Sequence, residues 1–314
     1  MIPFEYRTPK SLKEVHATLK EFGSDAKLIA GGTSLVIMMR QRLVRPNCLV
    51  SLRSVRGLNS IEIHDGGTRI GGLATHREVE SSSLLRRRLP LLAETYHHVA
   101  TIRVRNMATV GGGLAHADPN QDPPPTLIAL GATVKATSAD GSRVIPLDEF
   151  FTDYYETVLK PDEIVTEVFI PKMAPNSAGA YLKFLPRTAD DYATVSAAAV
   201  LTLDKTRRTI NDVRIALGSV GVTPIRATAA EALLRGQPLK AEAFAEAGEK
   251  AKEAVDPVSD FRGSAAYKKE MAGVFVRRAL EKALANLRQQ AKPKPALKAI
   301  KKAIKKAIKK GKKR

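Results

Sequence analysis

Cysteine and tryptophan are nearly missing from this sequence of 314 residues: Cys48 is the only cysteine, and there is no tryptophan. A single thiol cannot form an internal disulfide or supply the cysteine ligands of an iron–sulfur cluster. No run approaches about 18 uninterrupted apolar residues, and the N-terminus lacks a basic region followed by an apolar stretch. We therefore expect a cytoplasmic protein, and any iron–sulfur cluster must belong to a partner.

Acidic residues are missing from residues 291–314, which hold eleven lysines and one arginine. This low-complexity segment carries +12 of the formal charge of +19, so the body is only moderately basic. Leu297, Ile300, Ile304 and Ile308 share one face of a possible helix. Three interpretations stay open: a disordered solubilising tail, a helix on an anionic membrane surface such as the inner face of the membrane, or salt-sensitive binding to nucleic acid or another polyanion.

The first clear element is a helix predicted at residues 12–22, which Ser11 can cap and Gly23 can stop. A short strand is expected at residues 26–29 and a helix at residues 35–39, with a glycine pair between them. This order of strand, glycine turn and helix is typical of a nucleotide site.

The pattern changes near residue 178, after a cluster that contains Pro171, Pro175 and Asn176. Long strands are expected first and helices afterwards, which favours a separate α+β subdomain. The strands are expected at residues 178–185, 194–203 and 210–219, and the helices at residues 227–234, 241–254 and 265–287.

Two glycine-rich segments carry the functional signal. They are Ala30, Gly31, Gly32, Thr33 and Ser34, and Thr109, Val110, Gly111, Gly112 and Gly113. Without a Cβ in the way, backbone amides can approach an anionic ligand closely. Two such segments can bracket a pyrophosphate, and a nearby carboxylate, that of Asp118 or Asp122, can accept from a ribose hydroxyl, although either segment alone is also compatible with a plain turn. Neither matches G-x-G-x-x-G, so an ordinary Rossmann fold is not indicated.

These two segments, with Gln121 and Asp122 behind the second, resemble the FAD-binding subunit of the xanthine dehydrogenase family of molybdenum hydroxylases. The medium subunits of aerobic carbon monoxide dehydrogenases are the most similar branch. The likeness covers residues 1–287, including residues 190–194 and 267–274, and leaves out the tail.

The resemblance implies an α+β protein with an FAD-binding fold of the vanillyl-alcohol-oxidase (PCMH) type. That domain is expected at residues 1–174, in two α/β subdomains of about residues 1–55 and 56–174. A domain with a three-stranded antiparallel sheet plus helices is expected at residues 175–290, followed by the Lys-rich tail at 291–314.

The resemblance also assigns roles to individual residues. Both glycine segments would hold the FAD diphosphate, and Asp122 would bind a polar part of the cofactor, with Val165 and Lys183 beside it. Tyr192 would cover the isoalloxazine ring and gate it, or else be a buried structural tyrosine. Lys183 pairing with Asp190 or Asp191 is an alternative, as is a solvated turn for those two aspartates.

Two positions depart from the family pattern. Gly113 stands where the family usually has Asn, and Ile102, Arg103 and Val104 replace the usual Pro-Gln-Ile. We expect FAD to bind, but less tightly than with the Asn. Arg103 and Arg105 would meet the flavin phosphates or a partner, or form surface salt bridges only.

The family arrangement implies an electron-transfer subunit. A large partner would hold the molybdopterin cofactor, a small partner two [2Fe-2S] clusters, and the assembly would be a dimer of heterotrimers. FAD here would pass electrons to quinone, NAD or oxygen. The rival hypotheses are a nucleic-acid-associated protein acting through its tail and a self-contained flavin oxidase, although no nucleophile–base pair or metal-ligand cluster stands out.

Overall fold

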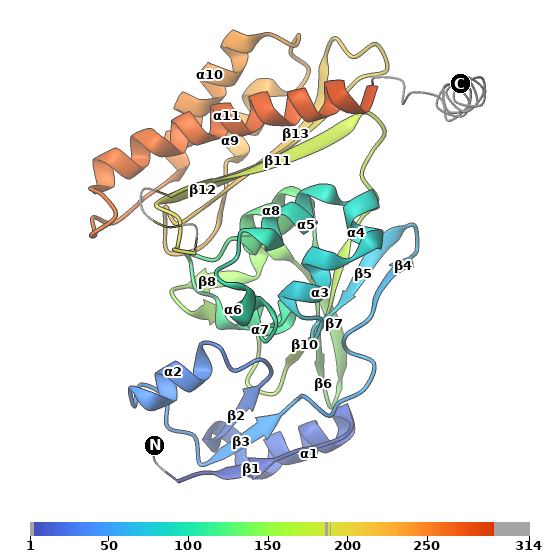
Figure 1. Cartoon of the computed structure of the whole chain (residues 1–314), viewed down its shortest axis with the longest axis vertical. Coiled ribbons are helices and arrows are strands. Elements are labelled where there is room, and N and C mark those ends of the chain that lie inside the picture. Colours follow the sequence, from blue (N-terminus) through green and yellow to red (C-terminus); the bar gives the residue numbers. More distant parts are fainter. Residues whose placement is uncertain (1–2, 186–187, 189, 292–314) are drawn as a thin grey trace, which may run out of the picture.

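The computed structural model describes residues 3–185, 188 and 190–291, so the predictions for the Lys-rich tail lie outside the described residues. Figure 1 shows three layered units stacked along the long axis of the molecule, with the N-terminal unit at one end and the C-terminal unit at the other.

The N-terminal unit is a parallel three-stranded sheet in the order β1 (Glu5–Arg7), β3 (Cys48–Ser51), β2 (Ala26–Ile29). Helix α1 (Leu12–Phe22) begins at Ser11, whose side chain accepts from the Glu14 amide, and it packs its apolar residues against β3. Helix α2 (Leu35–Arg40) follows β2 after the first glycine segment.

The middle unit is a five-stranded antiparallel sheet with helices over one face. Its strands, in spatial order, are β4 (Ile61–His64), β5 (Gly67–Gly71), β10 (Ile164–Ile170), β6 (Thr133–Ser138) and β7 (Gly141–Pro146). Its helices are α3 (His76–Ser81), α4 (Ser83–Arg88), α5 (Pro90–His97), α6 (Ile102–Arg105), α7 (Val110–His116) and α8 (Pro123–Ala129). A small hairpin, β8 (Phe151–Asp153) with β9 (Glu156–Thr157), lies beyond the sheet.

The C-terminal unit is an antiparallel meander that continues with helices. Its strands are β11 (Ser177–Phe184), β12 (Val195–Leu203), β13 (Ile210–Gly218) and β14 (Ile225–Arg226), and its helices are α9 (Thr228–Leu234), α10 (Ala241–Ala251) and α11 (Ala265–Ala291). The two-residue strand β14 is a fourth strand, where three were expected, because it is too short to leave a pattern in the sequence.

Strand β12 is buried along its whole length because both faces of its sheet are covered. Ala197 and Ala199 pack in the cluster formed with α10 and α11, whereas Ala198 and Val200 pack in the core of the middle unit. Figure 1 shows α9, α10 and α11 on one side of this sheet and α5 and α8 on the other. The C-terminal unit is therefore fixed to the middle unit through a shared apolar layer.

Within the described part of the chain, no helix combines the length and apolar character needed to cross a bilayer.

Candidate functional site

The first glycine segment forms a loop of unused backbone donors between β2 and α2. In the described chain, no acceptor is found for the amides of residues 31–34, nor for the hydroxyls of Thr33 and Ser34. Their carbonyls turn the other way, since those of Gly32 and Ser34 accept from amides inside α2. Gly32 has φ +70°, a conformation that a glycine adopts without strain. Consecutive free amides of this kind make a concave anion site.

The second glycine segment is the first turn of α7, and its amides are already used. Thr109 caps the helix: its Oγ1 accepts from the Gly112 amide at 3.2 Å, and its carbonyl accepts from the Gly113 amide at 2.9 Å. The Gly111 amide donates to the carbonyl of Gly72 at 2.8 Å. The expected amide donors of this segment are thus satisfied inside the protein, and the free donors belong to the first segment.

The two segments nevertheless touch, so they can contribute to one site. A Cβ on Gly31 would lie 2.0 Å from the carbonyl oxygen of Met107, so only glycine fits there. A Cβ on Gly112 would lie 3.6 Å from Cβ of Ala30, across the contact. We call residues 30–34 and 109–113 together the glycine cradle.

Val165 forms the floor of the cradle with its backbone. Its side chain is buried in the core, and its carbonyl oxygen would lie 2.1 Å from a Cβ on Gly72 and 3.0 Å from one on Gly111. The two glycines let α7 approach β10, which explains the close packing under the second segment. Val165 therefore borders the cradle through its main chain, and its place beside FAD stays a prediction.

Gly113 borders two polar side chains that the sequence analysis did not assign to the site. Gln121 Nε2 donates to the Gly113 carbonyl at 2.8 Å, and a Cβ on Gly113 would lie 3.0 Å from Gln121 Oε1 and 3.5 Å from His76 Nε2. Burial lowers the pKa of the His76 imidazole to about 4, so the ring is neutral near pH 7. Only the tertiary fold brings His76 here, because α3 follows a different strand in the sequence.

Asp122 is the centre of a buried polar cluster rather than an open carboxylate. Tyr181 Oη donates to its Oδ1 at 2.5 Å, and Lys183 Nζ donates to its Oδ2 at 2.9 Å. Lys183 Nζ also donates to the His98 carbonyl at 3.1 Å. Burial raises the pKa of the Asp122 carboxyl, and the charge of Lys183 opposes that rise. The alternative pairing of Lys183 with Asp190 or Asp191 is therefore wrong.

Tyr192 stands at the border between the middle and C-terminal units, and the residue is 44% exposed, so it is not a buried tyrosine. Its hydroxyl donates to Oδ2 of the buried Asp118 at 2.9 Å. Partial burial of the hydroxyl, together with Asp118, raises the pKa of Tyr192. Arg262 lies 5.7 Å from the ring centroid and 3.7 Å from Asp191, so Asp191 is not simply a solvated turn residue.

Arg105 is a structural clamp. It is buried, donates to Glu80 through Nε at 3.0 Å, and donates to the carbonyls of Val99 and Ala100. Burial would raise the pKa of the Glu80 carboxyl, but hydrogen bonds with His97 and Arg77, together with Arg105, lower it to about 2. Arg105 therefore orients the segment that leads into the cradle, and of the two arginines only Arg103 is exposed.

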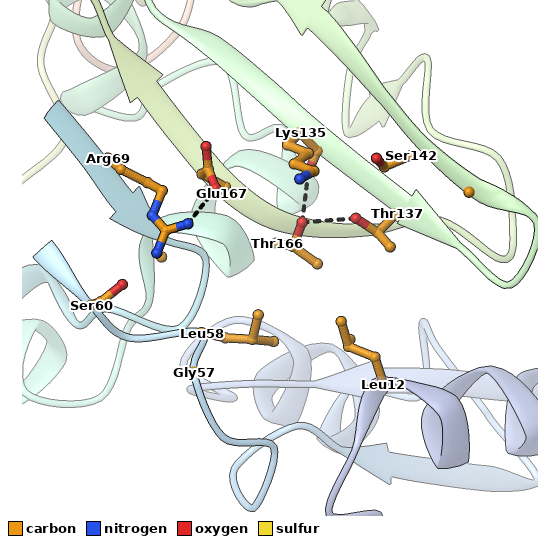
Figure 2. A pocket seen from close by; sticks show the side chains of 12 residues that line it. Leu12, Gly57, Leu58, Ser60, Arg69, Lys135, Thr137, Ser142, Thr166 and Glu167 are labelled. Carbon is orange, nitrogen blue, oxygen red and sulfur yellow. Dashed lines mark hydrogen bonds and ion pairs between the residues drawn. The ribbon is translucent and has the colours of Figure 1, made fainter. Parts of the chain in front are cut away.

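A cavity of about 380 Å³ lies away from the cradle, where α1 faces the sheet of the middle unit. Figure 2 shows Arg69, Lys135 and Thr166 on its sheet side and Leu12 and Leu58 on the opposite side. None of residues 30–34 or 109–113 lines the cavity. The cavity is not part of the cradle.

The fold and the free amides describe a protein with a site suited to an anionic ligand. Among the described residues, no group of three or more side chains could hold a metal ion. Comparison with known proteins identifies the cofactor. Residues 2–173 match the family model of the FAD binding domain in molybdopterin dehydrogenase, and residues 180–283 match that of the CO dehydrogenase flavoprotein C-terminal domain.

Among curated proteins, the carbon monoxide dehydrogenase medium chain of Hydrogenophaga pseudoflava is 38% identical over 91% of this chain and 99% of its own length. The alpha subunit of the 6-hydroxypseudooxynicotine dehydrogenase complex of Paenarthrobacter nicotinovorans is 36% identical over 90% and 94%. Among solved structures, carbon monoxide dehydrogenase from Hydrogenophaga pseudoflava aligns with a TM-score of 0.87, at 40% identity, over 91% of this chain and 99% of that chain. Quinoline 2-oxidoreductase from Pseudomonas putida 86 aligns with a TM-score of 0.85, at 35% identity, over 91% and 98%.

The chain belongs to the family of FAD-binding medium subunits of molybdenum hydroxylases, the xanthine dehydrogenase and carbon monoxide dehydrogenase family. It is an FAD-dependent oxidoreductase subunit. The resemblance, the α+β fold class and the cofactor expected from the sequence are confirmed. The roles of individual residues toward FAD stay predictions.

Proposed function

We propose that this chain transfers electrons through FAD within a heterotrimeric molybdenum hydroxylase. It would receive them from [2Fe-2S] clusters of a small partner and pass them to quinone, NAD or oxygen. FAD supplies the redox chemistry when bound. The observation that carries the proposal is the set of free amides at residues 31–34 in a chain of this family. Since Cys48 is the only cysteine and is buried in the core, the clusters require another polypeptide.

The chain's own residues then have separate tasks. The amides of residues 31–34, with the hydroxyls of Thr33 and Ser34, bind the diphosphate. The glycines of the second segment let α7 pack closely against its neighbours, which places the other wall of the cradle beside the first segment. Asp122 and Lys183 fix α8 to β11, and a polar part of the cofactor would lie against this buried cluster.

Tyr192 is proposed to cover the flavin and control access to it. Its hydroxyl is anchored on Asp118, and Arg262 holds its ring from the C-terminal unit. Replacing Tyr192 by alanine should make reduced flavin react faster with an external dye than in the wild type. Tyr192→Phe keeps the ring, so we expect its rate to lie close to that of the wild type. Equal rates in all three proteins would contradict the proposed role of Tyr192 as a gate.

A ligand series tests the diphosphate assignment. Purified full-length protein, alone or in its complex, is titrated with FAD, FMN and riboflavin, and flavin absorbance and fluorescence are followed. We expect FAD to bind most tightly and riboflavin least, because only FAD presents a diphosphate to the amides. Equal affinity for FAD and riboflavin would refute the assignment, and the absence of any flavin binding would refute the proposed function.

Partners are proposed on the same basis: a large molybdopterin subunit and a small [2Fe-2S] subunit, in a dimer of heterotrimers. A self-contained flavin oxidase is disfavoured, because the buried carboxylates Asp118, Asp122 and Glu80 are each engaged by side chains of the chain itself. Oxidation of a reduced substrate by the isolated chain would restore that alternative.

The tail supports a second role, in binding a polyanion or an anionic membrane surface, since residues 291–314 carry twelve cationic side chains and no acid. A gel-shift comparison of the full chain with a truncation after Gln290 tests it. Salt-sensitive DNA binding that is lost on truncation would support this role. Equal DNA affinity of the two proteins would show that the tail does not contribute to the binding.

A further inference from the structure

The cavity between α1 and the sheet of the middle unit adjoins a second hollow. The second hollow has a volume of about 290 Å³ and shares Leu12 and Thr137 with the cavity. We call the two together the interunit pocket, because α1 belongs to the N-terminal unit and the sheet to the middle unit. The cavity alone, at about 380 Å³, falls within the range of about 300–1,000 Å³ in which proteins bind small molecules.

Cationic side chains from both units line the interunit pocket. Arg69 and Lys135 come from the sheet, and Lys13 and Lys20 come from α1. Glu167 is the only acid among the lining residues, and its Oε2 lies 3.5 Å from Nη1 of Arg69. The three lysines therefore leave an excess of positive charge on a concave surface, which attracts an anion.

Uncharged groups complete a site for an organic anion. Figure 2 shows Thr137 and Thr166 beside Lys135 on the sheet, with Leu12 and Leu58 across the cavity. The hydroxyls of Thr137 and Thr166 are 2.9 Å apart, and that of Thr166 also reaches the Lys135 carbonyl at 3.3 Å. When Thr166 donates to Thr137, the proton of Thr137 is free to bind a ligand oxygen. The two leucines offer an apolar wall for the rest of the ligand.

His16 gives independent evidence for a ligand. It follows Lys13 at a spacing that places both on one face of α1, it is 9% exposed, and it lines the second hollow. Neither ring nitrogen forms a hydrogen bond with the described residues. Burial lowers the pKa of the imidazole, and the nearby Asp162 opposes that effect. Buried polar atoms nearly always have a partner, so an unpartnered ring at the wall of a hollow indicates a ligand or an ordered water.

We propose that the interunit pocket binds a small organic anion, a phosphate or carboxylate on an aromatic or apolar body. Lys135 and Thr137 hold the anionic group from the sheet, while the lysines of α1 approach it from the other unit. The body lies against Leu12 and Leu58. Such a ligand contacts both units at once, so its binding stabilises their arrangement. The proposal does not depend on electron transfer, because the glycine cradle contributes no residue to the pocket.

The test uses the full-length protein saturated with FAD, so that the cradle is occupied. Isothermal titration calorimetry measures the binding of AMP, benzoate, inorganic phosphate and adenosine, and the Tm of unfolding is followed in parallel. AMP and benzoate distinguish a phosphate from a carboxylate. Adenosine lacks the charge, and inorganic phosphate lacks the body.

We expect AMP or benzoate to bind with a Kd of about 1 mM or tighter and to raise the Tm. Adenosine and inorganic phosphate should bind about tenfold more weakly than the better organic anion. The absence of binding by every anion, or binding of adenosine or inorganic phosphate as tight as that of the organic anions, would overturn the proposal. Binding of AMP only to FAD-free protein would assign it to the cradle and would also overturn the proposal.

Three variants locate the binding. Lys135→Gln removes a cation, and Ser142→Phe narrows the cavity from β7 without changing the charge, so each should bind the organic anion about tenfold more weakly. Lys205→Gln is the matched control, because it removes an exposed lysine of the C-terminal unit, and it should bind like the wild type. The absorbance of bound FAD shows that each variant keeps its fold. Unchanged binding in Lys135→Gln and Ser142→Phe would refute the pocket as the site.

Discussion

At Gly31 the lack of a side chain decides whether two distant segments of the chain can touch. The neighbouring carbonyl of Met107 occupies the space where a Cβ would stand. From the sequence, both glycine segments were explained in the same way, by the close approach of backbone amides to a phosphate. The structure separates two reasons: residues 31–34 offer amides, whereas Gly111 mainly lets α7 pack against Gly72 and Val165.

Replacing Gly31 by alanine should therefore destabilise the protein and weaken FAD binding together. The new Cβ meets backbone atoms, which cannot rotate away, so we expect a loss of about 3 kcal/mol in the free energy of unfolding. Urea unfolding and FAD titration measure the two effects. Gly57→Asn is the control, because open space surrounds Gly57 and Asn tolerates its positive φ. A Gly31→Ala protein as stable as that control would contradict the packing argument.

Gly113→Asn should tighten FAD binding, because it introduces the side-chain amide that the resemblance to the family implies at this position. The structure adds a condition: Gln121 must shift by a few tenths of an ångström to admit the new Cβ. Gly113→Ala isolates that steric cost without adding an amide. We expect Gly113→Asn to bind FAD more tightly than Gly113→Ala. Equal affinity of the two variants would show that the amide does not reach the cofactor.

Elements were predictable from the sequence where local patterns are strong. The strand at 26–29, the helix after it and the long C-terminal strands lie where apolar spacing and capping residues indicate. Helix α7 was not predicted, because three consecutive glycines argue against a helix. The Thr109 cap and the contacts with Gly72 and Ala74 stabilise it instead. In α7, tertiary contacts therefore outweigh the low helix propensity of glycine.

The helices around Glu80 give the structure a specific response to acid. Its carboxylate joins α3 to the end of α5 and to α6 through His97 and Arg105. Because the pKa of Glu80 is lowered from 4.5 to about 2, its ionised form stabilises the fold above pH 4.5. That contribution, about 3 kcal/mol, is lost as the pH falls toward 2.

The stability difference between wild type and Glu80→Gln should accordingly shrink between pH 4.5 and pH 2. Urea unfolding of both proteins at pH 6 and pH 3 measures it. Glu253→Gln, at an exposed ion pair with Lys250, should show a small difference at either pH. A difference for Glu80 that does not depend on pH would mean that its carboxyl is not held ionised by these partners.

On the scale of the whole molecule, a buried ion pair joins two units that a sequence reader would treat as separate domains. Asp122 at the start of α8 and Lys183 on β11 are both almost fully buried. Lys183→Met leaves a buried carboxylate without its cation, and we expect a loss of about 3–5 kcal/mol. The double variant Asp122→Asn with Lys183→Met should lose less than the sum of the two single losses.

Lys282→Met provides the comparison, since Lys282 forms an exposed pair with Glu94 between the same two units. Its loss should be at most about 1 kcal/mol. Equal losses for Lys183→Met and Lys282→Met in urea unfolding would show that burial does not govern the strength of the Asp122 pair.

The sequence by itself determined the family, the cofactor and most of the elements, because those depend on local patterns and on motifs that remain recognisable along one chain. The tertiary structure alone decided which donors are free. Whether a backbone amide can bind a phosphate depends on whether another part of the fold already accepts from it, as Gly72 does for Gly111 and nothing in the described chain does for residues 31–34. The same holds for Asp122 and Arg105, whose charges are engaged by residues distant in sequence. Long-range packing assigns those partners.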